Sequence, residues 1–192
     1  VTFPGYEWSG NTPLGGDRNV YFISEGGRIT RSCTDLLPGK ISSYEDSPTA
    51  SVLFEKLKAV GGPRPFAFAH VGGRYADMRI HDPDIELAVE VHSAWGTFEW
   101  LVEDALSRGY RIGICANSDD HKGRPGASYP GAGKFGSLGG LTCILARKLD
   151  RKHVFEALAS RHFYATTGHR CLIDLKVVTA DNRQAMIGDV ID

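Results

Sequence analysis

Apolar segments with the length and composition of β-strands alternate with helical segments along this chain, and this alternation constrains the fold more than any other feature. We expect helices to begin near Ser47, Thr97 and Asp150, each followed by apolar residues at helical spacing. We expect strands at residues 1–8, 19–23, 65–69, 85–91, 110–116, 141–146, 163–167 and 172–179. Strands that alternate with helices are typical of parallel β/α units.

The expected strands show little alternation of apolar and polar residues, as is usual when both faces of a sheet are buried. A β/α barrel and an open doubly wound sheet both fit this pattern. No glycine-rich dinucleotide fingerprint and no Walker motif is present, which disfavours an open nucleotide-binding sheet. We therefore predict an α/β fold with mostly parallel strands, for which a barrel and an open sheet both remain possible at this point.

The composition of the chain disfavours several classes of partner and site. A net charge of -1 over 192 residues gives no electrostatic reason to expect nucleic acid or an anionic membrane surface. No apolar run reaches the roughly 18 residues that a transmembrane helix needs. The four cysteines have no C-x-x-C spacing, so a zinc–thiolate site is not expected, and a reducing compartment such as the cytoplasm is slightly favoured.

Acidic and imidazole side chains follow the expected strands at the points where these strands end. They are Glu7, His70, His92, Asp119 and His121. In a β/α barrel the carboxyl ends of the strands converge on one face, so these residues would share one pocket. Imidazole and carboxylate together bind zinc, manganese or iron, and two close ions can activate a water molecule. The sequence therefore predicts a metal centre.

Several of these segments also resemble the PHP (polymerase and histidinol phosphatase) domains. Residues 3–7, Phe-Pro-Gly-Tyr-Glu, resemble their glutamate motif, and residues 69–70 resemble their later strand-end histidine. Residues 117–121, Asn-Ser-Asp-Asp-His, resemble their final Gly-Ser-Asp-x-His motif. Residues 89–96 and 161–168 resemble a branch of this superfamily whose function is unassigned.

The resemblance implies a distorted seven-stranded (β/α)7 barrel, up to three divalent ions, and hydrolysis of phosphate esters by an activated water. Carried over by position, the metal ligands would be Glu7, His70, Asp119 and His121. Asp119 and His121 would also be the catalytic residues. The chain would then be a metal-dependent hydrolase that acts on a small anionic, phosphorylated substrate.

The chain departs from this pattern at two places. The opening His-x-His motif is absent, and Asn19 stands where many members have a histidine. The chain begins without Met and ends within a strand-like pattern, so we interpret both ends as cuts in a longer protein. We expect residues 1–170 to be the C-terminal portion of a barrel without its first β/α unit, followed by a β-rich extension at residues 171–192. The metal centre should therefore be incomplete.

Other polar residues are candidates for supporting roles. We expect Asn19 and His92 to support the ligands or to face the substrate, and His81 to face solvent. Arg74 and Arg124 lie in loops after the expected ligand strands, where a guanidinium suits a phosphate group. A barrel without its first strand would expose an unpaired edge, which we expect a second copy of the chain to cover.

Two alternatives stay open. A catalytically incomplete domain that binds a ligand or partner would fit the missing ligands. An amidohydrolase-like enzyme acting on C–N bonds would fit a barrel, but such enzymes typically use a lysine at a strand exit, and none is found there.

Overall fold

The structure is a computed structural model that describes residues 1–32, 46–123 and 138–191. The chain folds into two compact units, Val1–Leu87 and Ala88–Asp192. The boundary lies within one strand, β4 (Glu86–Ser93), which begins in the first unit and continues in the second. No helix in the described ranges is long and apolar enough to span a membrane.

The first unit is built on an antiparallel meander of three strands, β1 (Gly5–Trp8), β2 (Arg18–Tyr21) and β3 (Phe66–Ala69). A single turn of 3-10 helix, η1 (Thr12–Leu14), lies in the connection between β1 and β2. That connection is too short for the helical crossover that parallel neighbours require, so β2 returns antiparallel to β1.

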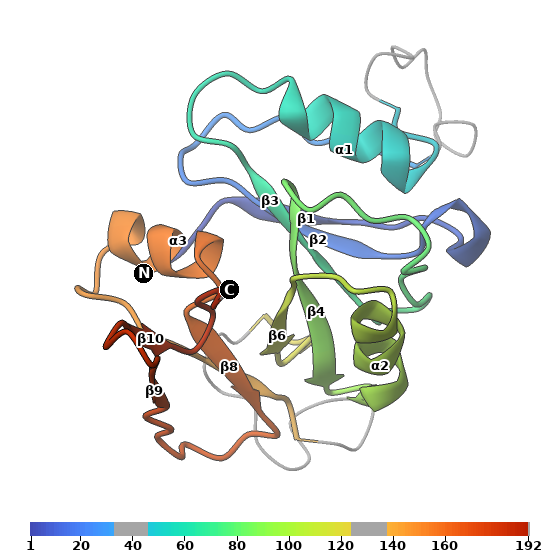
Figure 1. Cartoon of the computed structure of the whole chain (residues 1–192). Helices are drawn as coiled ribbons and strands as arrows, with labels where there is room; N and C mark the ends of the chain where they lie inside the picture. The colour runs from blue at the N-terminus through green and yellow to red at the C-terminus, as the bar shows by residue number, and fades with distance from the viewer. Residues whose placement is uncertain (33–45, 124–137, 192) are drawn as a thin grey trace. The chain divides into compact units, whose positions relative to one another are not determined.

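Helix α1 (Ala50–Lys58) covers one face of this meander (Figure 1). The core between them consists of buried side chains from the helix and the strands, namely Trp8, Val20, Phe22, Ala50, Leu53, Phe54, Leu57, Ala67 and Ile85. The helix begins two residues later than the sequence predicts, because Thr49 is the N-cap and accepts a hydrogen bond from the backbone of Val52. Ser47 instead accepts the indole N–H of buried Trp8 at its carbonyl, over 3.0 Å.

The second unit contains one β/α/β element of the expected parallel kind. The continuation of β4 turns into β5 (Gly96–Thr97), helix α2 (Glu99–Ser107) follows, and β6 (Gly113–Ala116) pairs with β4 in parallel. Gly109, with a φ of 76°, follows the helix and adopts the left-handed conformation that favours glycine at a helix end.

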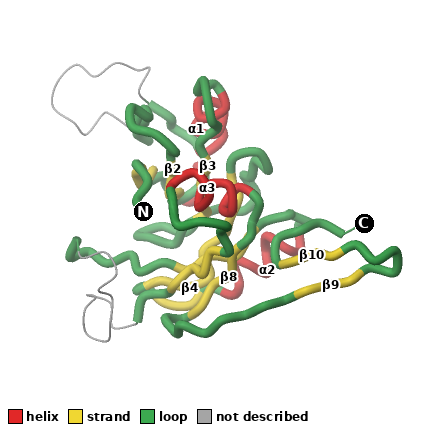
Figure 2. The backbone as a smooth tube through the Cα atoms, turned by 90° about the vertical axis from the view of Figure 1, so that its left-hand side faces the viewer, coloured by secondary structure: helices red, strands yellow, loops and turns green. Residues whose placement is uncertain are grey.

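The other described strands of the second unit pair in antiparallel fashion. Strands β7 (Leu141–Ile144) and β8 (Phe163–Thr166) pair with each other, and helix α3 (Arg151–Ala159) lies between them in sequence. The predicted cap of this helix is confirmed, since the side chain of Asp150 accepts a hydrogen bond from the backbone of His153. Strands β9 (Lys176–Val178) and β10 (Gln184–Met186) form a separate two-stranded ribbon, reached through a long irregular segment (Figure 2).

The prediction of a partial (β/α)7 barrel was wrong. The described residues contain three α-helices and no closed barrel. The pairs β1–β2, β2–β3, β4–β5, β7–β8 and β9–β10 are antiparallel, and β4–β6 is parallel. Period and composition locate apolar strands but do not give the direction of pairing, because β2–β3 and β7–β8 are antiparallel although α1 and α3 lie between them in sequence. The expectation that a second copy covers an open barrel edge loses its reason together with the barrel.

Candidate metal centre

Three acidic and imidazole side chains meet at one edge of the β1–β2–β3 meander. The register places Trp8 opposite Arg18 and Arg18 opposite Ala69. Glu7 therefore lies beside the end of β1, Asp17 immediately precedes β2, and His70 immediately follows β3. Since β2 runs opposite to its neighbours, its start lies at the edge where β1 and β3 end.

Gly72 leaves a gap that these three side chains surround. A Cβ atom placed on Gly72 would lie 2.9 Å from Oδ2 of Asp17, 3.1 Å from Oε1 of Glu7 and 3.1 Å from Nε2 of His70. Any larger residue at position 72 would displace at least one of them. The loop is held by a bridge between Val71 and Tyr75. The absence of a side chain at Gly72 thus keeps a small space lined by two carboxylates and an imidazole.

Glu7 and His70 are the closest pair in this cluster. Nε2 of His70 lies 3.7 Å from Oε2 of Glu7, and the two side chains offer ligand atoms within 4.8 Å of each other. The His70 side chain is buried, whereas that of Glu7 is 38% exposed. Ser9 donates its hydroxyl to Oε1 of Glu7 over 3.0 Å. The sequence prediction that Glu7 and His70 lie together is therefore confirmed, although no barrel brings them there.

Asp17 was missed by sequence reasoning, which examined only the carboxyl ends of strands. This side chain is fully buried and is held by Arg74. The backbone N–H of Arg74 donates to Oδ2 of Asp17 over 2.9 Å, and its Nε donates to Oδ1 over 3.1 Å. The signal available in the sequence was the run Gly15-Gly16-Asp17 before a strand, a pattern of a tight loop that presents a carboxylate.

Close backbone contacts hold together the loops on which these residues lie. The N–H of Asp77 donates to the carbonyl of Gly15 over 2.8 Å. Gly16 has a φ of 72°, and a Cβ on it would lie 1.9 Å from the carbonyl oxygen of Tyr75. Only glycine fits such an approach, so the Gly15–Gly16 sequence fixes the loop that holds Asp17.

Asn19 lies directly opposite Glu7 in the β1–β2 register. Facing residues of an antiparallel pair project from the same face of the sheet, so Asn19 neighbours Glu7 as a supporting residue would.

Beside them on β2, Arg18 is fully buried and forms an ion pair with Glu86, which His81 also contacts over 2.8 Å. The expectation that His81 faces solvent was wrong, since its side chain is 5% exposed and belongs to this buried network.

The Asp119/His121 motif belongs to the second unit, directly after β6. The indole N–H of Trp95 donates to Oδ2 of Asp119 over 2.5 Å, and the Trp95 ring meets the His121 ring edge-on at 6.2 Å. Asp119 has a φ of 44°, and its carbonyl lies 2.9 Å from Nδ1 of His121. That Asp119 and His121 join Glu7 and His70 as ligands of one centre stays a prediction.

His92 has a structural role within its unit. Its Nδ1 lies 2.8 Å from the hydroxyl of Thr97, and its Nε2 lies 2.8 Å from the carbonyl of Leu138. Both ring nitrogens are thereby engaged, and the side chain is buried. Arg124, the other candidate for substrate contact, lies outside the described residues.

The fold and the site together define a mixed α and β protein with a carboxylate–imidazole cluster at one edge of an antiparallel meander. No family model matches the chain, and no solved structure matches it. An uncharacterized protein of Chlamydia pneumoniae is 26% identical over 94% of this chain and 30% of its own length. An uncharacterized protein of Chlamydia trachomatis is 28% identical over 51% of this chain and 19% of its own length. The chain spans less than a third of the length of these curated relatives.

Proposed function

We propose that this chain forms a divalent metal centre that serves the hydrolysis of phosphate esters. The observation that supports the proposal is the gap at Gly72, around which Glu7, Asp17 and His70 place ligand-type atoms at about the same distance. Imidazole and carboxylate groups that converge on one small space are the donor set that divalent metal ions bind. This convergence, and not the cost of burial, supports a bound ion, since Glu7 is 38% exposed and Asp17 is already paired with Arg74.

The donor set fits the metals that the sequence predicts. One imidazole and carboxylate oxygens suit zinc, manganese or iron, whereas an all-oxygen set would favour magnesium or calcium. His70 would provide Nε2 and Glu7 a carboxylate oxygen. Asp17 faces the same gap, but both of its carboxylate oxygens accept hydrogen bonds from Arg74. We therefore propose that Asp17 holds the loop that contains Arg74 and is not a metal ligand. A bound ion would lower the pKa of a water molecule and polarise a phosphoryl oxygen.

Arg74 is the residue that we propose contacts the phosphate group. Its Nε is fixed by buried Asp17, while its side chain is 42% exposed. Its two terminal NH2 groups make no hydrogen bond within the part of the chain that the structure describes. A guanidinium held at one edge and open at the other suits a tetrahedral anion, because it can donate two parallel hydrogen bonds. The resemblance of the Glu7 and Asp119/His121 segments to PHP hydrolases supports the same class of substrate.

The experiment that tests the proposal is a titration of the metal-free chain with Zn²⁺ and Mn²⁺ by calorimetry. Glu7→Gln and His70→Gln should each weaken binding by tenfold or more, since each removes one ligand. His169→Gln is the matched control, because His169 is an exposed loop histidine, and it should bind as the wild type does. Hydrolysis of p-nitrophenyl phosphate and its bis ester in the presence of the bound metal then tests the reaction.

Two outcomes separate the alternatives. Metal binding without hydrolysis of any ester would favour a binding domain over an enzyme. Failure of the folded wild-type chain to bind either metal would overturn the proposal as a whole.

A further inference from the structure

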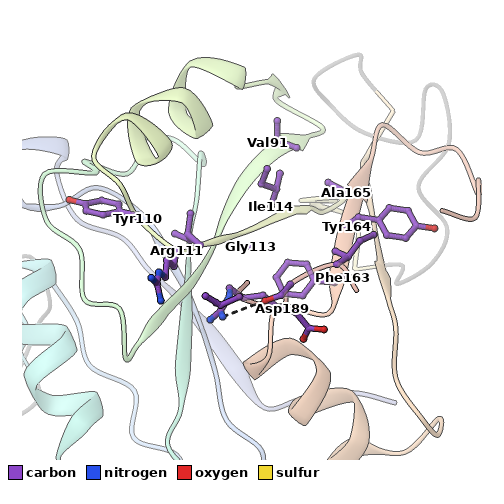
Figure 3. Close-up of a pocket in the computed structure, with 14 residues that line it drawn as sticks. Val91, Tyr110, Arg111, Gly113, Ile114, Phe163, Tyr164, Ala165 and Asp189 are labelled. Carbon is purple, nitrogen blue, oxygen red and sulfur yellow. Dashed lines mark hydrogen bonds between the residues drawn. The ribbon is translucent and has the colours of Figure 1, made fainter. Parts of the chain in front are cut away.

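A cavity lies wholly within the second unit, and its lining includes none of the residues of the candidate metal centre. It has a volume of about 600 Å³ and is bordered by β6, β8 and residues 187–190 (Figure 3). Pockets for small organic molecules usually have volumes of about 300–1,000 Å³. The size of this cavity, which we name the β6–β8 pocket, is therefore sufficient for a ligand with a ring or a short chain.

Two arginines and one aspartate line the β6–β8 pocket. Arg111 precedes β6 and Arg161 precedes β8, and among the described residues neither forms an ion pair, although Arg161 interacts electrostatically with Asp189 at longer range. The one acidic residue of the lining is Asp189, and it is already engaged. Its Oδ1 lies 2.9 Å from Nε2 of His162, and its Oδ2 accepts the backbone N–H of Met186 over 2.8 Å. The pocket therefore has an excess of positive charge.

The remaining walls are apolar. The ring of Phe163 packs directly on Gly113, where a Cβ would lie 2.3 Å from the ring carbon Cζ. Ile114 and Val91 also contribute to the lining, and Figure 3 shows their side chains beside β6. Tyr164 lines the pocket too, but its hydroxyl donates to the carbonyl of Cys171 over 2.8 Å and so is turned to another partner.

The wall formed by residues 187–190 is fixed to the base of the pocket. Gly188 has a φ of 95°, and a Cβ on it would lie 2.2 Å from the carbonyl oxygen of Arg161. Nη2 of Arg161 donates weakly to the carbonyl of Gly188, over 3.5 Å. This wall thus lies against the residue that precedes β8, and the pocket is preformed within its own unit.

We propose that the β6–β8 pocket binds a small organic anion, with a carboxylate, phosphonate or sulfonate group at Arg111 and Arg161 and an apolar body along Ile114 and Val91, which are both partly exposed. Guanidinium groups are weakly hydrated and pair with planar or tetrahedral oxyanions. Apolar walls beside them contribute affinity for a ring or alkyl chain in proportion to the area removed from water. Neither the guanidinium groups nor the apolar walls alone would select such a ligand, but their combination does.

The probe for this proposal is phenylphosphonate, whose C–P bond a phosphoesterase does not hydrolyse. Its binding to the full chain is measured by calorimetry in the presence of EDTA, so that no metal contributes. Phenylphosphonate should bind at least tenfold more tightly than inorganic phosphate, which lacks the ring, and than benzyl alcohol, which lacks the charge. Chemical-shift changes should map to residues 111–114 and 161–165.

Variants give the decisive comparison. Arg111→Gln should weaken binding of phenylphosphonate about three- to tenfold, because the lost interaction is charge-assisted but lies at the exposed rim. Arg170→Gln, an exposed arginine outside the pocket, is the control and should leave binding unchanged. Arg161→Gln should weaken binding as well, and circular dichroism will show whether it also disturbs the fold.

Three results would overturn the proposal. They are equal affinity for phenylphosphonate and benzyl alcohol, an unchanged affinity of Arg111→Gln, and shift changes confined to residues outside the pocket. Gly72→Ala should retain phenylphosphonate binding, so failure at the metal centre and failure at the β6–β8 pocket are distinguishable.

Discussion

The backbone N–H of His70 donates to the carbonyl of Asp17 over 3.2 Å, and this bond joins the residue after β3 to the residue before β2. Because both side chains also border Gly72, the bond fixes two members of the cluster relative to each other. A site built on paired strand ends is more rigid than one built on free loops. The candidate metal centre therefore depends on the β2–β3 register as much as on the identity of its side chains.

The gap at Gly72 yields the sharpest test of the metal centre. Gly72→Ala should weaken Zn²⁺ and Mn²⁺ binding at least about tenfold, because the added methyl group would occupy the space and press on Asp17. Gly73→Ala is the matched control, since nothing lies within 4 Å of a Cβ at that position. Calorimetric titration of both variants measures the difference. Equal affinities would show that the ion, if bound, lies elsewhere.

Arg74 and Arg79 allow a comparison of two loop arginines that each pair with an aspartate. Arg74→Lys should raise KM for phosphate monoesters about three- to tenfold, because lysine keeps the charge but loses the planar fork. Arg79→Lys should leave KM unchanged, since Arg79 is occupied by Asp77. Steady-state kinetics with p-nitrophenyl phosphate measures both. A KM that rises equally in the two variants would point to a general loss of positive charge instead.

At Asp119, the effect of the carboxylate charge on metal affinity can be separated from the effect of backbone strain on stability. Its φ of 44° is tolerated by asparagine, whose amide oxygen can still accept the indole N–H of Trp95. Asp119→Asn should therefore change the free energy of unfolding by no more than about 0.5 kcal/mol while lowering metal affinity. Urea denaturation and calorimetry test the two parts. Unchanged metal affinity would remove Asp119 from the proposed ligands.

The buried network behind the site should contribute strongly to stability. Removal of Glu86 leaves the guanidinium of Arg18 in the core without its carboxylate, so Glu86→Ala should cost about 3–5 kcal/mol of unfolding free energy. The surface pair of Arg108 and Asp104 is the comparison, and Asp104→Ala should cost less than about 1 kcal/mol. Both values follow from urea denaturation. Similar costs for the two variants would mean that Arg18 becomes solvated in the Glu86 variant.

The wall of the β6–β8 pocket should respond to acid. The backbone N–H of Met186, and next the imidazole of His162, hold the pKa of Asp189 below its ordinary value. A carboxyl whose pKa is lowered in the folded state stabilises it above the ordinary value of about 4, and this contribution disappears as the pH falls through the lowered pKa. The amide shift of Met186 should titrate in that acidic range, and Asp189→Asn should abolish the titration. A titration that persists in Asp189→Asn would assign it to another group.

Sequence reasoning located most elements and two members of the cluster. Helical spacing and the capping side chain of Asp150 predict α3 correctly, because these signals act within one turn of helix. Glu7 and His70 were recognisable because each has a metal-ligand side chain at the end of an expected apolar strand. The sequence alone thus determined which segments are strands and which polar residues stand at their ends.

Only the tertiary structure decided how those ends meet. The antiparallel return of β2 brings Asp17 to the edge where Glu7 and His70 lie, and the same packing buries His81 against Glu86. Pairing direction depends on contacts between residues far apart in the chain, and no local pattern of side chains encodes it. The physical reason is that hydrophobic periodicity records which faces are buried, whereas register and direction are set by the connections and by the packing of the whole unit.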